Sequence, residues 1–206
     1  MIRKLYNIPY QDYVMHQNKL RKLRKECIIL LEHLPVITAG VNYQKTNLLV
    51  AESYLQKNGI DLCFIPRGGD FTAHEPGQLV IYPHVDLKKR GLSIHDFIKF
   101  LMESLISAVL DIWNLQLSYF QDKPGLYLAS NPQKKLISMG ISFKSFFTSF
   151  GVAINIKNDR KLFELIHPCG GKSSDIISIK SLGLDTEKEI EFIYRFRSEF
   201  KKRVGL

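Results

Sequence analysis

A cysteine in a loop-forming segment is the residue of this sequence best suited to covalent chemistry. Cys169 lies within HPCGGK (167–172), where proline and glycine predict a loop rather than a packed strand. A thiol becomes a nucleophile when a neighbouring cation or base favours its thiolate form. His167 is one candidate for that role, and Lys135, at the start of the apolar segment KLISMGI, is the other. These residues suit a group transfer in which the thiol carries the group as a thioester.

The other two cysteines, Cys27 and Cys63, lie inside apolar runs, and we expect them to be small core residues. The sequence has three cysteines in all and no C-x-x-C pair. An odd number of cysteines without paired spacing favours reduced thiols and a cytoplasmic location.

A glycine-rich segment, IPRGGDFTAHEPGQLVIYP (65–83), is the second candidate for chemistry. Its glycines let a ligand approach the backbone closely, and Arg67 can hold a carboxylate, a phosphate or a backbone carbonyl. Thr72, His74 and Gln78 add directional hydrogen-bonding groups. This composition is typical of one wall of a binding site. The alternative is a solvated connection between two strands.

Two helices have the clearest signals among the elements that must position these residues. One is predicted over 93–112, where Ser93 and Asp96 form a capping box and the apolar residues have helical spacing. The other is an amphipathic C-terminal helix that begins at Thr186, with Glu189 completing a second capping box. We expect both helices to contribute core packing rather than chemistry.

The remaining elements are mostly short strands separated by turn signals. Strands are predicted over 3–8, 27–32, 36–38, 60–65, 78–82, 115–120, 125–128, 135–143 and 150–156, with further helices over 10–25 and 51–57. Pro35, Pro124, Asn131-Pro132 and Lys144-Ser145 are predicted to separate strands. Because helices flank a run of strands without strict alternation, the predicted class is α+β, in a single domain over 1–206.

The charge of the chain indicates an acidic partner. Lysine and arginine number 29 against 20 aspartate and glutamate residues, giving a net charge of +9. Nucleic acid, an anionic membrane or an acidic carrier protein would each suit this charge. The sequence starts without an apolar stretch of signal-peptide length, and its most apolar long window, 97–117, is interrupted by charges. Secretion and membrane spanning are therefore disfavoured.

Taken together, four segments carry a family resemblance. RGGDFTAHEPGQLVIYP, KLISMGI, SFGVAIN and IHPCG occur in the order and at the spacing of the lipoyl/octanoyl transferase family, and the lead-in LEHLPVITAG also matches. The chain resembles that family over roughly residues 30–175. The resemblance implies a fold shared with lipoate and biotin protein ligases, in which a mixed β-sheet is flanked by helices and forms one catalytic domain.

The resemblance also implies a reaction. An octanoyl or lipoyl group would pass from acyl carrier protein to Cys169 and then to the lysine of a lipoyl domain, in 2-oxoacid dehydrogenases and the glycine cleavage system. Lys135 matches the lysine that lowers the pKa of the nucleophilic thiol and transfers protons. The implied substrate-binding residues are Arg67, Gly68, Gly69, Asp70, Phe71, Thr72, Ala73, His74, Ser138, Met139, Gly140, Gly151, Val152 and Ala153. No cofactor, no metal, no nucleic acid and no membrane is expected to take part, and the location implied is cytoplasmic.

Two positions depart from the family pattern. Glu75 stands where a glycine is usual, and Phe150 stands where a histidine is expected before Gly151. A glutamate cannot adopt a positive φ as easily as glycine, so substrate preference is less firmly implied than the reaction. Phe143, Phe146, Phe147 and Leu79 offer apolar lining for the acyl chain, with ordinary core packing as the alternative for most of these phenylalanines. The amides of Gly170 and Gly171, or those near His74, are candidates to hold the oxyanion.

Two alternatives remain open at this point. An ATP-dependent lipoate or biotin protein ligase would share the fold, although the sequence contains no G-x-G-x-x-G loop. A nucleic-acid-binding protein would fit the charge and the mixture of basic and aromatic residues in EFIYRFRSEFKKR. That last segment places its aromatic residues on one helix face, as a packed helix does.

Overall fold

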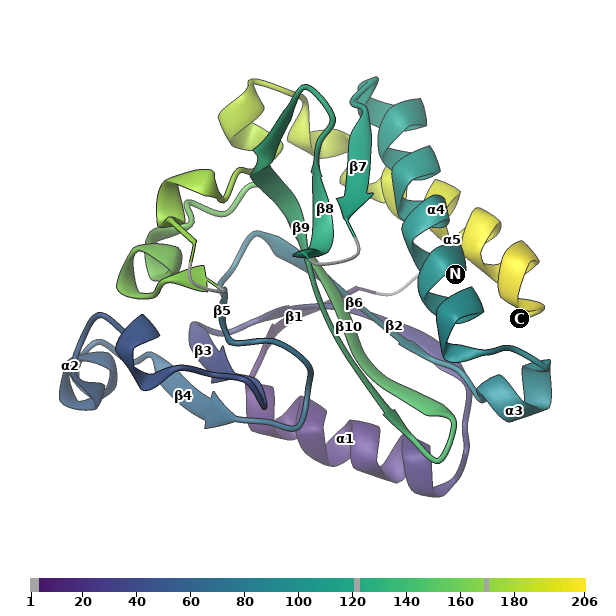
Figure 1. The fold of residues 1–206 in the computed structure, drawn as a ribbon, viewed down its shortest axis with the longest axis horizontal. Coiled ribbons are helices and arrows are strands. Elements are labelled where there is room, and N and C mark those ends of the chain that lie inside the picture. Colours follow the sequence, from purple (N-terminus) through teal and green to yellow (C-terminus); the bar gives the residue numbers. More distant parts are fainter. Residues whose placement is uncertain (1–3, 121–122, 169–170) are drawn as a thin grey trace.

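The computed structural model describes residues 4–120, 123–168 and 171–206, and most of its strands form one large mixed sheet (Figure 1). Within these residues the sheet has seven strands. Their spatial order is β1 (Lys4–Ile8), β2 (Cys27–His33), β6 (Gln78–His84), β10 (Phe147–Asn155), β9 (Asn131–Lys144), β8 (Lys123–Leu128) and β7 (Leu117–Phe120). Strands β1 and β2 are parallel and the other neighbours are antiparallel.

A second, smaller sheet lies beside the first. It contains β4 (Asp61–Phe64), β3 (Val36–Ala39) and β5 (Phe71–His74), with β3 parallel to β4 and antiparallel to β5. The α+β class with mixed sheets and flanking helices is thus confirmed. The two strands on either side of Pro35 do not pair with each other, because the chain leaves the large sheet there and enters the small one. Strand β5, inside the glycine-rich segment, was not predicted.

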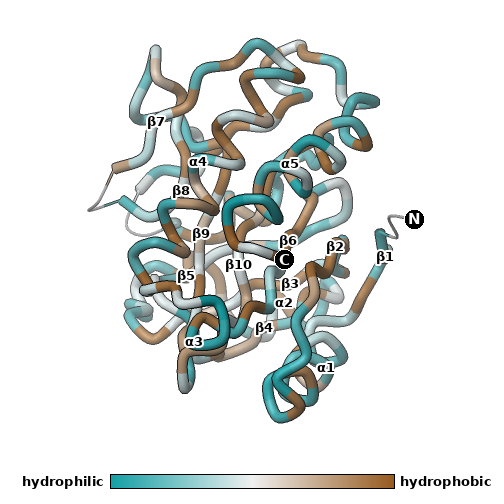
Figure 2. Tube along the Cα trace, turned by 90° about the vertical axis from the view of Figure 1, so that its right-hand side faces the viewer, coloured by the Kyte–Doolittle hydropathy of each residue, from teal (hydrophilic) through white to brown (hydrophobic). Residues whose placement is uncertain are grey.

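Helices α4 (Ile94–Trp113) and α5 (Glu189–Val204) pack together against the large sheet and bury the main core. The capping box of α4 is confirmed, since Asp96 N donates to Ser93 Oγ (3.0 Å) and Ser93 N donates to Asp96 Oδ2 (3.2 Å). Along α5, hydrophobic and hydrophilic residues alternate as an amphipathic helix requires (Figure 2). The three phenylalanines of α5, Phe192, Phe196 and Phe200, are fully buried in this core, whereas Tyr194 is exposed.

The second predicted capping box is wrong. Residues Thr186–Lys188 form a 3₁₀ turn capped by Asp185, and α5 begins at Glu189. The Glu189 carboxylate instead pairs with Lys4, which also bonds Glu32 Oε1 at 2.6 Å. Because a buried ammonium group needs carboxylate partners, the Glu189 side chain pairs with Lys4 and does not cap the helix.

Helix α1 (Tyr10–Lys22) packs on the opposite face of the large sheet from α4 and α5. It ends three residues before the predicted boundary, because Arg24 turns into the left-handed region with φ +48°. Short helices α2 (Glu52–Lys57) and α3 (Leu87–Arg90) follow the small sheet's first strand and β6, respectively. None of the described helices is long and apolar enough to cross a bilayer.

Two of the predicted breaks do not separate strands. Pro124 is the second residue of β8 and Pro132 is the second residue of β9. Proline is tolerated near a strand end, because its missing N–H there costs few of the hydrogen bonds between the strands. The predicted break at Lys144-Ser145 holds, since Ser145 and Phe146 both have positive φ and form the tight turn between β9 and β10.

Candidate functional site

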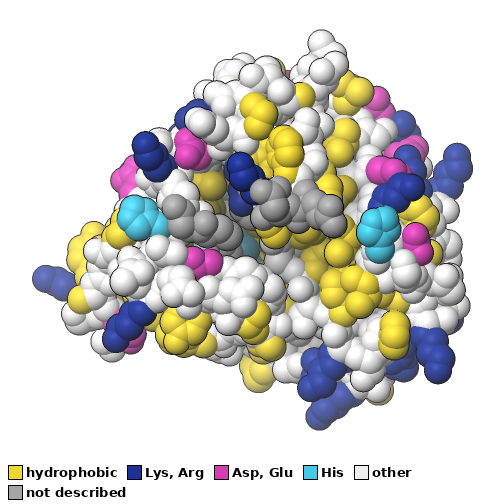
Figure 3. All heavy atoms as spheres, viewed as in Figure 1, with side chains coloured by type: hydrophobic (Ala, Val, Ile, Leu, Met, Phe, Trp, Pro, Cys, Tyr) yellow, Lys and Arg dark blue, Asp and Glu magenta, His cyan; other side chains and the backbone are white. Residues whose placement is uncertain are grey.

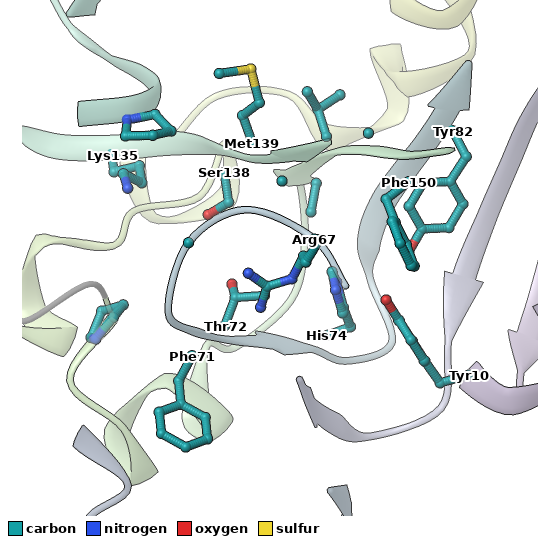
Figure 4. Close-up of a pocket in the computed structure, with 17 residues that line it drawn as sticks. Tyr10, Arg67, Phe71, Thr72, His74, Tyr82, Lys135, Ser138, Met139 and Phe150 are labelled. Carbon is teal, nitrogen blue, oxygen red and sulfur yellow. The ribbon is translucent and has the colours of Figure 1, made fainter. Parts of the chain in front are cut away.

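A cavity lies between the glycine-rich segment and the antiparallel pair β9 and β10 (Figure 4). It brings together twelve of the residues implied by the family resemblance: Arg67, Gly69, Phe71, Thr72, His74, Lys135, Ser138, Met139, Gly140, Gly151, Val152 and Ala153. Tyr10, Tyr82, Pro124, Phe150 and Pro168 complete its lining. Three chain segments far apart in sequence therefore meet at one site.

The Arg67 side chain is buried and ties the glycine-rich segment to β3. Its Nη2 donates to Thr38 O and Thr38 Oγ1, both at 2.8 Å, and its Nη1 donates to Gly68 O at 3.0 Å. Gly140 makes this placement possible, because a Cβ there would come within 2.7 Å of Arg67 Cδ. These two residues set the spacing between the wall and β9.

Three of the implied substrate-binding residues do not line the cavity. Asp70 accepts hydrogen bonds from Gln44 N (3.0 Å) and from the side chain of Asn47, so it braces the segment that precedes α2. Ala73 is fully buried in the core of the small sheet. Gly68 faces the backbone of β9 near Ile141. In this structure these residues shape the wall from behind.

His74 is held in a buried amide network at the cavity wall. Its Nδ1 lies 2.7 Å from Gln78 Oε1, and Gln78 Nε2 donates to Asn155 Oδ1 at 2.9 Å. Because the Gln78 amide nitrogen is already committed, its oxygen accepts from His74 Nδ1–H. Burial lowers the pKa of His74 to about 3, so the ring is neutral at neutral pH.

Aromatic rings from α1, β6 and β10 form the far end of the cavity, opposite Lys135 (Figure 4). Tyr10 stacks on His74 with ring centroids 5.8 Å apart, and Tyr82 OH lies 3.0 Å from His33 Nε2. Burial raises the pKa of both tyrosines and lowers that of His33 to about 4. These tyrosine and histidine side chains are therefore uncharged at neutral pH.

Tyr10 and Tyr82 were missed by sequence reasoning. Tyr10 is the first residue of α1, outside every recognised segment, and Tyr82 is the second-last residue of the glycine-rich segment, without a motif role of its own. Alternation along β6 could have suggested Tyr82, since Val80 and Tyr82 face α1 while Leu79 and Ile81 face the main core.

The apolar residues expected to line the site are placed elsewhere. Leu79 and Phe147 are fully buried in packed core, Phe143 packs edge-on against Phe97, and Phe146 is exposed at the hairpin turn. The β9–β10 hairpin extends past the cavity, so its tip carries these phenylalanines away from it. Phe150 is the phenylalanine of β10 that lines the cavity instead.

The two departures from the family pattern have different consequences. Phe150 has φ +60° and its ring packs edge-on against Tyr13, with centroids 6.3 Å apart. It brings an apolar ring into the cavity wall. Glu75 does not need a positive φ here; it is buried, accepts from Asn158 Nδ2 at 2.9 Å and does not line the cavity.

Lys135 is 9% exposed and lines the cavity from β9, as expected of a lysine withdrawn from water. Its Nζ lies 5.0 Å from the centre of the Tyr127 ring. Gly125 allows this path, since its φ is +129° and a Cβ there would lie 2.3 Å from Ile137 O and 3.4 Å from Lys135 Cε. Any side chain at Gly125 would displace the strand that carries the lysine.

Cys169 and Gly170 lie outside the described residues, and the residues on either side of them reach the cavity region. Pro168 lines the cavity, and Gly171 N donates to Pro168 O at 3.0 Å. Further along, Ile177 N donates to Lys135 O at 2.9 Å. His167 is exposed and does not line the cavity, so of the two candidate activators only Lys135 is in the site.

The other cysteines are unsuited to nucleophilic chemistry. Cys63 is buried in the core on the α1 side, and Cys27 is half-buried at the start of β2. Burial raises the pKa of both thiols, which lowers the thiolate fraction at neutral pH. Among the described residues, no group of three or more His, Cys, Asp or Glu side chains is arranged to hold a metal ion.

Comparisons with known proteins identify the family to which the chain belongs. The family model of the lipoyl protein ligase A/B catalytic domain matches residues 4–201. An octanoyltransferase of Leptospira borgpetersenii serovar Hardjo-bovis is 50% identical over 100% of this chain and 94% of its own length. An octanoyltransferase of Leptospira interrogans is 56% identical over 86% of this chain and 82% of its own.

The fold is shared with solved ligases. A bi-partite lipoate protein ligase from Thermoplasma acidophilum, solved in a study with its E2 lipoyl domain, superposes with a TM-score of 0.73 at 14% identity, covering 100% of this chain and 84% of that one. At this identity the likeness extends to the fold alone. With the family model matching nearly the whole chain and relatives at 50–56% identity, the chain belongs to the lipoyl protein ligase A/B catalytic domain family and is an acyltransferase.

Proposed function

We propose that the chain transfers an octanoyl group from acyl carrier protein to Cys169 and then to a lysine of a lipoyl domain. The observation that supports this most directly is the placement of Lys135, buried at the cavity beside Pro168, the residue that precedes the cysteine. The octanoyltransferase relatives support octanoyl as the group that is transferred. The solved lipoate protein ligase, which was studied with its E2 lipoyl domain, supports a lipoyl domain as the acceptor.

In the first step, the Cys169 thiolate attacks the carbonyl carbon of the carrier thioester. A C–S bond to Cys169 forms, the C–S bond to the carrier breaks, and the departing thiolate takes a proton. One thioester replaces another, so the exchange is nearly balanced in free energy and requires no ATP. A positively charged Lys135 would favour the attacking thiolate.

In the second step, the amine of the acceptor lysine attacks the acyl-enzyme. A C–N bond forms, the C–S bond to Cys169 breaks, and the amine loses a proton. After Lys135 has given its proton to the departing carrier thiolate, its neutral amine can accept the proton of the incoming lysine. One buried lysine would thus serve both half-reactions.

The acyl chain would extend from Lys135 toward the aromatic end of the cavity. Between these ends lie Ser138, Met139 and the Gly151–Ala153 backbone, which offer a narrow, mostly apolar passage. His74, which lines this passage, is neutral and so adds no charge to it.

The test is incubation of the purified protein with octanoyl acyl carrier protein, followed by intact-protein mass measurement and peptide mapping. We expect one octanoyl group on Cys169, its transfer to a lipoyl domain, and no dependence on ATP or magnesium. A strict ATP requirement would favour the lipoate ligase alternative, and an adduct on another residue would refute Cys169 as the nucleophile.

A further inference from the structure

A second recess adjoins the cavity on the other side of Lys135. Its lining includes Lys123, Tyr127, Gln133, Lys172 and Asp175, and its volume of about 470 Å³ lies within the range of small-molecule sites. We call it the basic groove. Pro124, Lys135 and Pro168 line both the cavity and the basic groove. The two spaces therefore meet where the acyl carbonyl would lie.

The basic groove has a surplus of positive charge. Its one described carboxylate, Asp175, pairs with Lys134 Nζ at 3.4 Å, and Lys134 also donates to Ser174 O at 2.8 Å. Lys134 is thus half-buried and engaged with Asp175 and the Ser174 carbonyl. Lys123 and Lys172, both exposed, remain to face a ligand along the groove.

The groove is fixed to the site by backbone contacts. The Ile177 N–H bonds to Lys135 O, which joins the segment after Lys172 to the strand with Lys135, and the Gly171 N–H bonds to Pro168 O within the loop. When the acyl chain lies in the cavity, the group attached to the other side of the acyl carbonyl points toward this groove. In the proposed first half-reaction that group is the pantetheine arm of the carrier, a slim polar chain that ends in a phosphodiester.

We propose that the basic groove binds the phosphopantetheine arm of the acyl donor, with Lys123 and Lys172 recognising its phosphate. Gln133 and Ser174 offer hydrogen-bonding partners for the amides of the arm. Lysine suits a phosphate as a point charge that needs no fixed orientation. The inference rests on the proposed function, because the arm enters only with a thioester donor.

The test compares two small donors, octanoyl-pantetheine and octanoyl-4′-phosphopantetheine, which differ only in the phosphate. We expect the wild-type protein to have a higher kcat/KM for the phosphorylated donor. In the double variant Lys123→Ala/Lys172→Ala, the ratio of the two kcat/KM values should fall about fivefold, as expected for two exposed charge contacts. Lys57→Ala/Lys99→Ala removes the same charge from exposed sites outside the groove and should leave the ratio unchanged.

Each outcome bears on a separate statement. Equal kcat/KM values for the two donors in the wild type, or an equal fall in the control variant, would refute the assignment of the groove while leaving octanoyl transfer intact. Transfer from neither donor nor from the carrier protein would refute the proposed function itself. Competition adds a readout without turnover: free 4′-phosphopantetheine should inhibit more strongly than pantetheine, and the double variant should abolish that difference.

Discussion

The cavity and the basic groove lie on either side of Lys135, and they are built by different means. The cavity is made of strand side chains in fixed contacts, with a neutral His74 and aromatic rings at its far end. The groove has a mixed lining, in which exposed polar side chains such as Lys123 and Lys172 lie among prolines and buried residues. The cavity should therefore select the acyl chain by shape, whereas the groove should recognise its carrier by charge.

The largest expected effect lies where the two spaces meet. Cys169→Ala should abolish acyl-enzyme formation and octanoyl transfer, because no thioester can form without the thiol. Mass measurement after incubation with octanoyl donor checks this. Cys27→Ala and Cys63→Ala, which change buried or half-buried thiols, should retain transfer. Comparable loss in a folded Cys63 variant would place the nucleophile elsewhere.

Lys135→Met should have the next largest effect. If Lys135 acts on the thiol as proposed, removing its charge should raise the pKa of Cys169 by about one to three units and slow acylation at neutral pH by about tenfold or more. The measurement is the rate of thiol alkylation against pH. Lys134→Met is the matched control, because its ammonium bonds Ser174 and Asp175 instead. An unmoved alkylation profile in Lys135→Met would exclude this electrostatic role.

The cavity side should make the protein sensitive to acid. Burial lowers the pKa values of His33, His74 and His84 to about 4, 3 and 4. Below pH 6.5 the unfolded chain binds protons that the folded chain does not, so stability falls as pH decreases toward 4. Each histidine should contribute a slope of about 1.4 kcal/mol per pH unit.

The Glu26 carboxylate does not share this pH window. Arg90 holds the pKa of Glu26 down to about 2, so the stability linked to Glu26 is lost only below about pH 4.5. The free energy of unfolding, measured with denaturant between pH 4.5 and 6.5, should fall with the slope given by the histidines. In His84→Phe that slope should be smaller by the contribution of one histidine, about 1.4 kcal/mol per pH unit. An unchanged slope in that variant would show that His84 is not neutral in the folded state.

The sequence predicted the residues near Lys135 and along the middle of the cavity better than those at its aromatic far end. The segments that carry Arg67 to His74, Ser138 to Gly140 and Gly151 to Ala153 were identified as motifs, and they lie around one cavity. Tyr10 was not identified, because its place depends on how α1 packs across the sheet rather than on local pattern. Glu189 was misassigned as a cap for a similar reason, since its partner Lys4 is 185 residues away.

Strand facing explains the misplaced apolar lining. Leu79 lies next to Val80 in β6, yet the two side chains point to opposite faces of the sheet and enter different cores. Composition marks such a residue as apolar without stating which face it covers. The register of β6 against β10, in which Leu79 pairs with Ile154, fixes the face and comes only from the folded topology.

Phe150 tests whether the cavity selects by shape. Phe150→Gly should extend the aromatic end and also relieve the positive φ, which favours glycine. The ratio of kcat/KM for decanoyl over octanoyl donors should rise, by up to about tenfold for the space of two methylenes at ~0.8 kcal/mol each. Phe143→Ala should lower stability without changing this ratio, since Phe143 packs against Phe97 away from the cavity. A ratio unchanged in Phe150→Gly would mean that another residue limits chain length.

The smallest expected effect concerns salt and separates the two basic regions of the surface. In Figure 3, lysines and arginines gather over the end of α1 and α3, away from the hollow in the middle of this face. Arg24 there pairs with Asp86, while Lys89 and Arg90 pair with Glu26, so much of that charge is already compensated. The steering of an acidic carrier should come instead from the basic groove.

Raising the salt from 0.1 to 0.5 M shortens the Debye length from about 10 Å to roughly half of that, which weakens steering between separated charges. The apparent KM for octanoyl acyl carrier protein should therefore rise, by about threefold to tenfold, while that for octanoyl-pantetheine should hardly change. Lys123→Ala/Lys172→Ala should remove most of the salt response, and Arg24→Ala should remove little of it. The reverse ranking would assign carrier docking to the α1 end, and the basic groove would then act only on the arm that enters it.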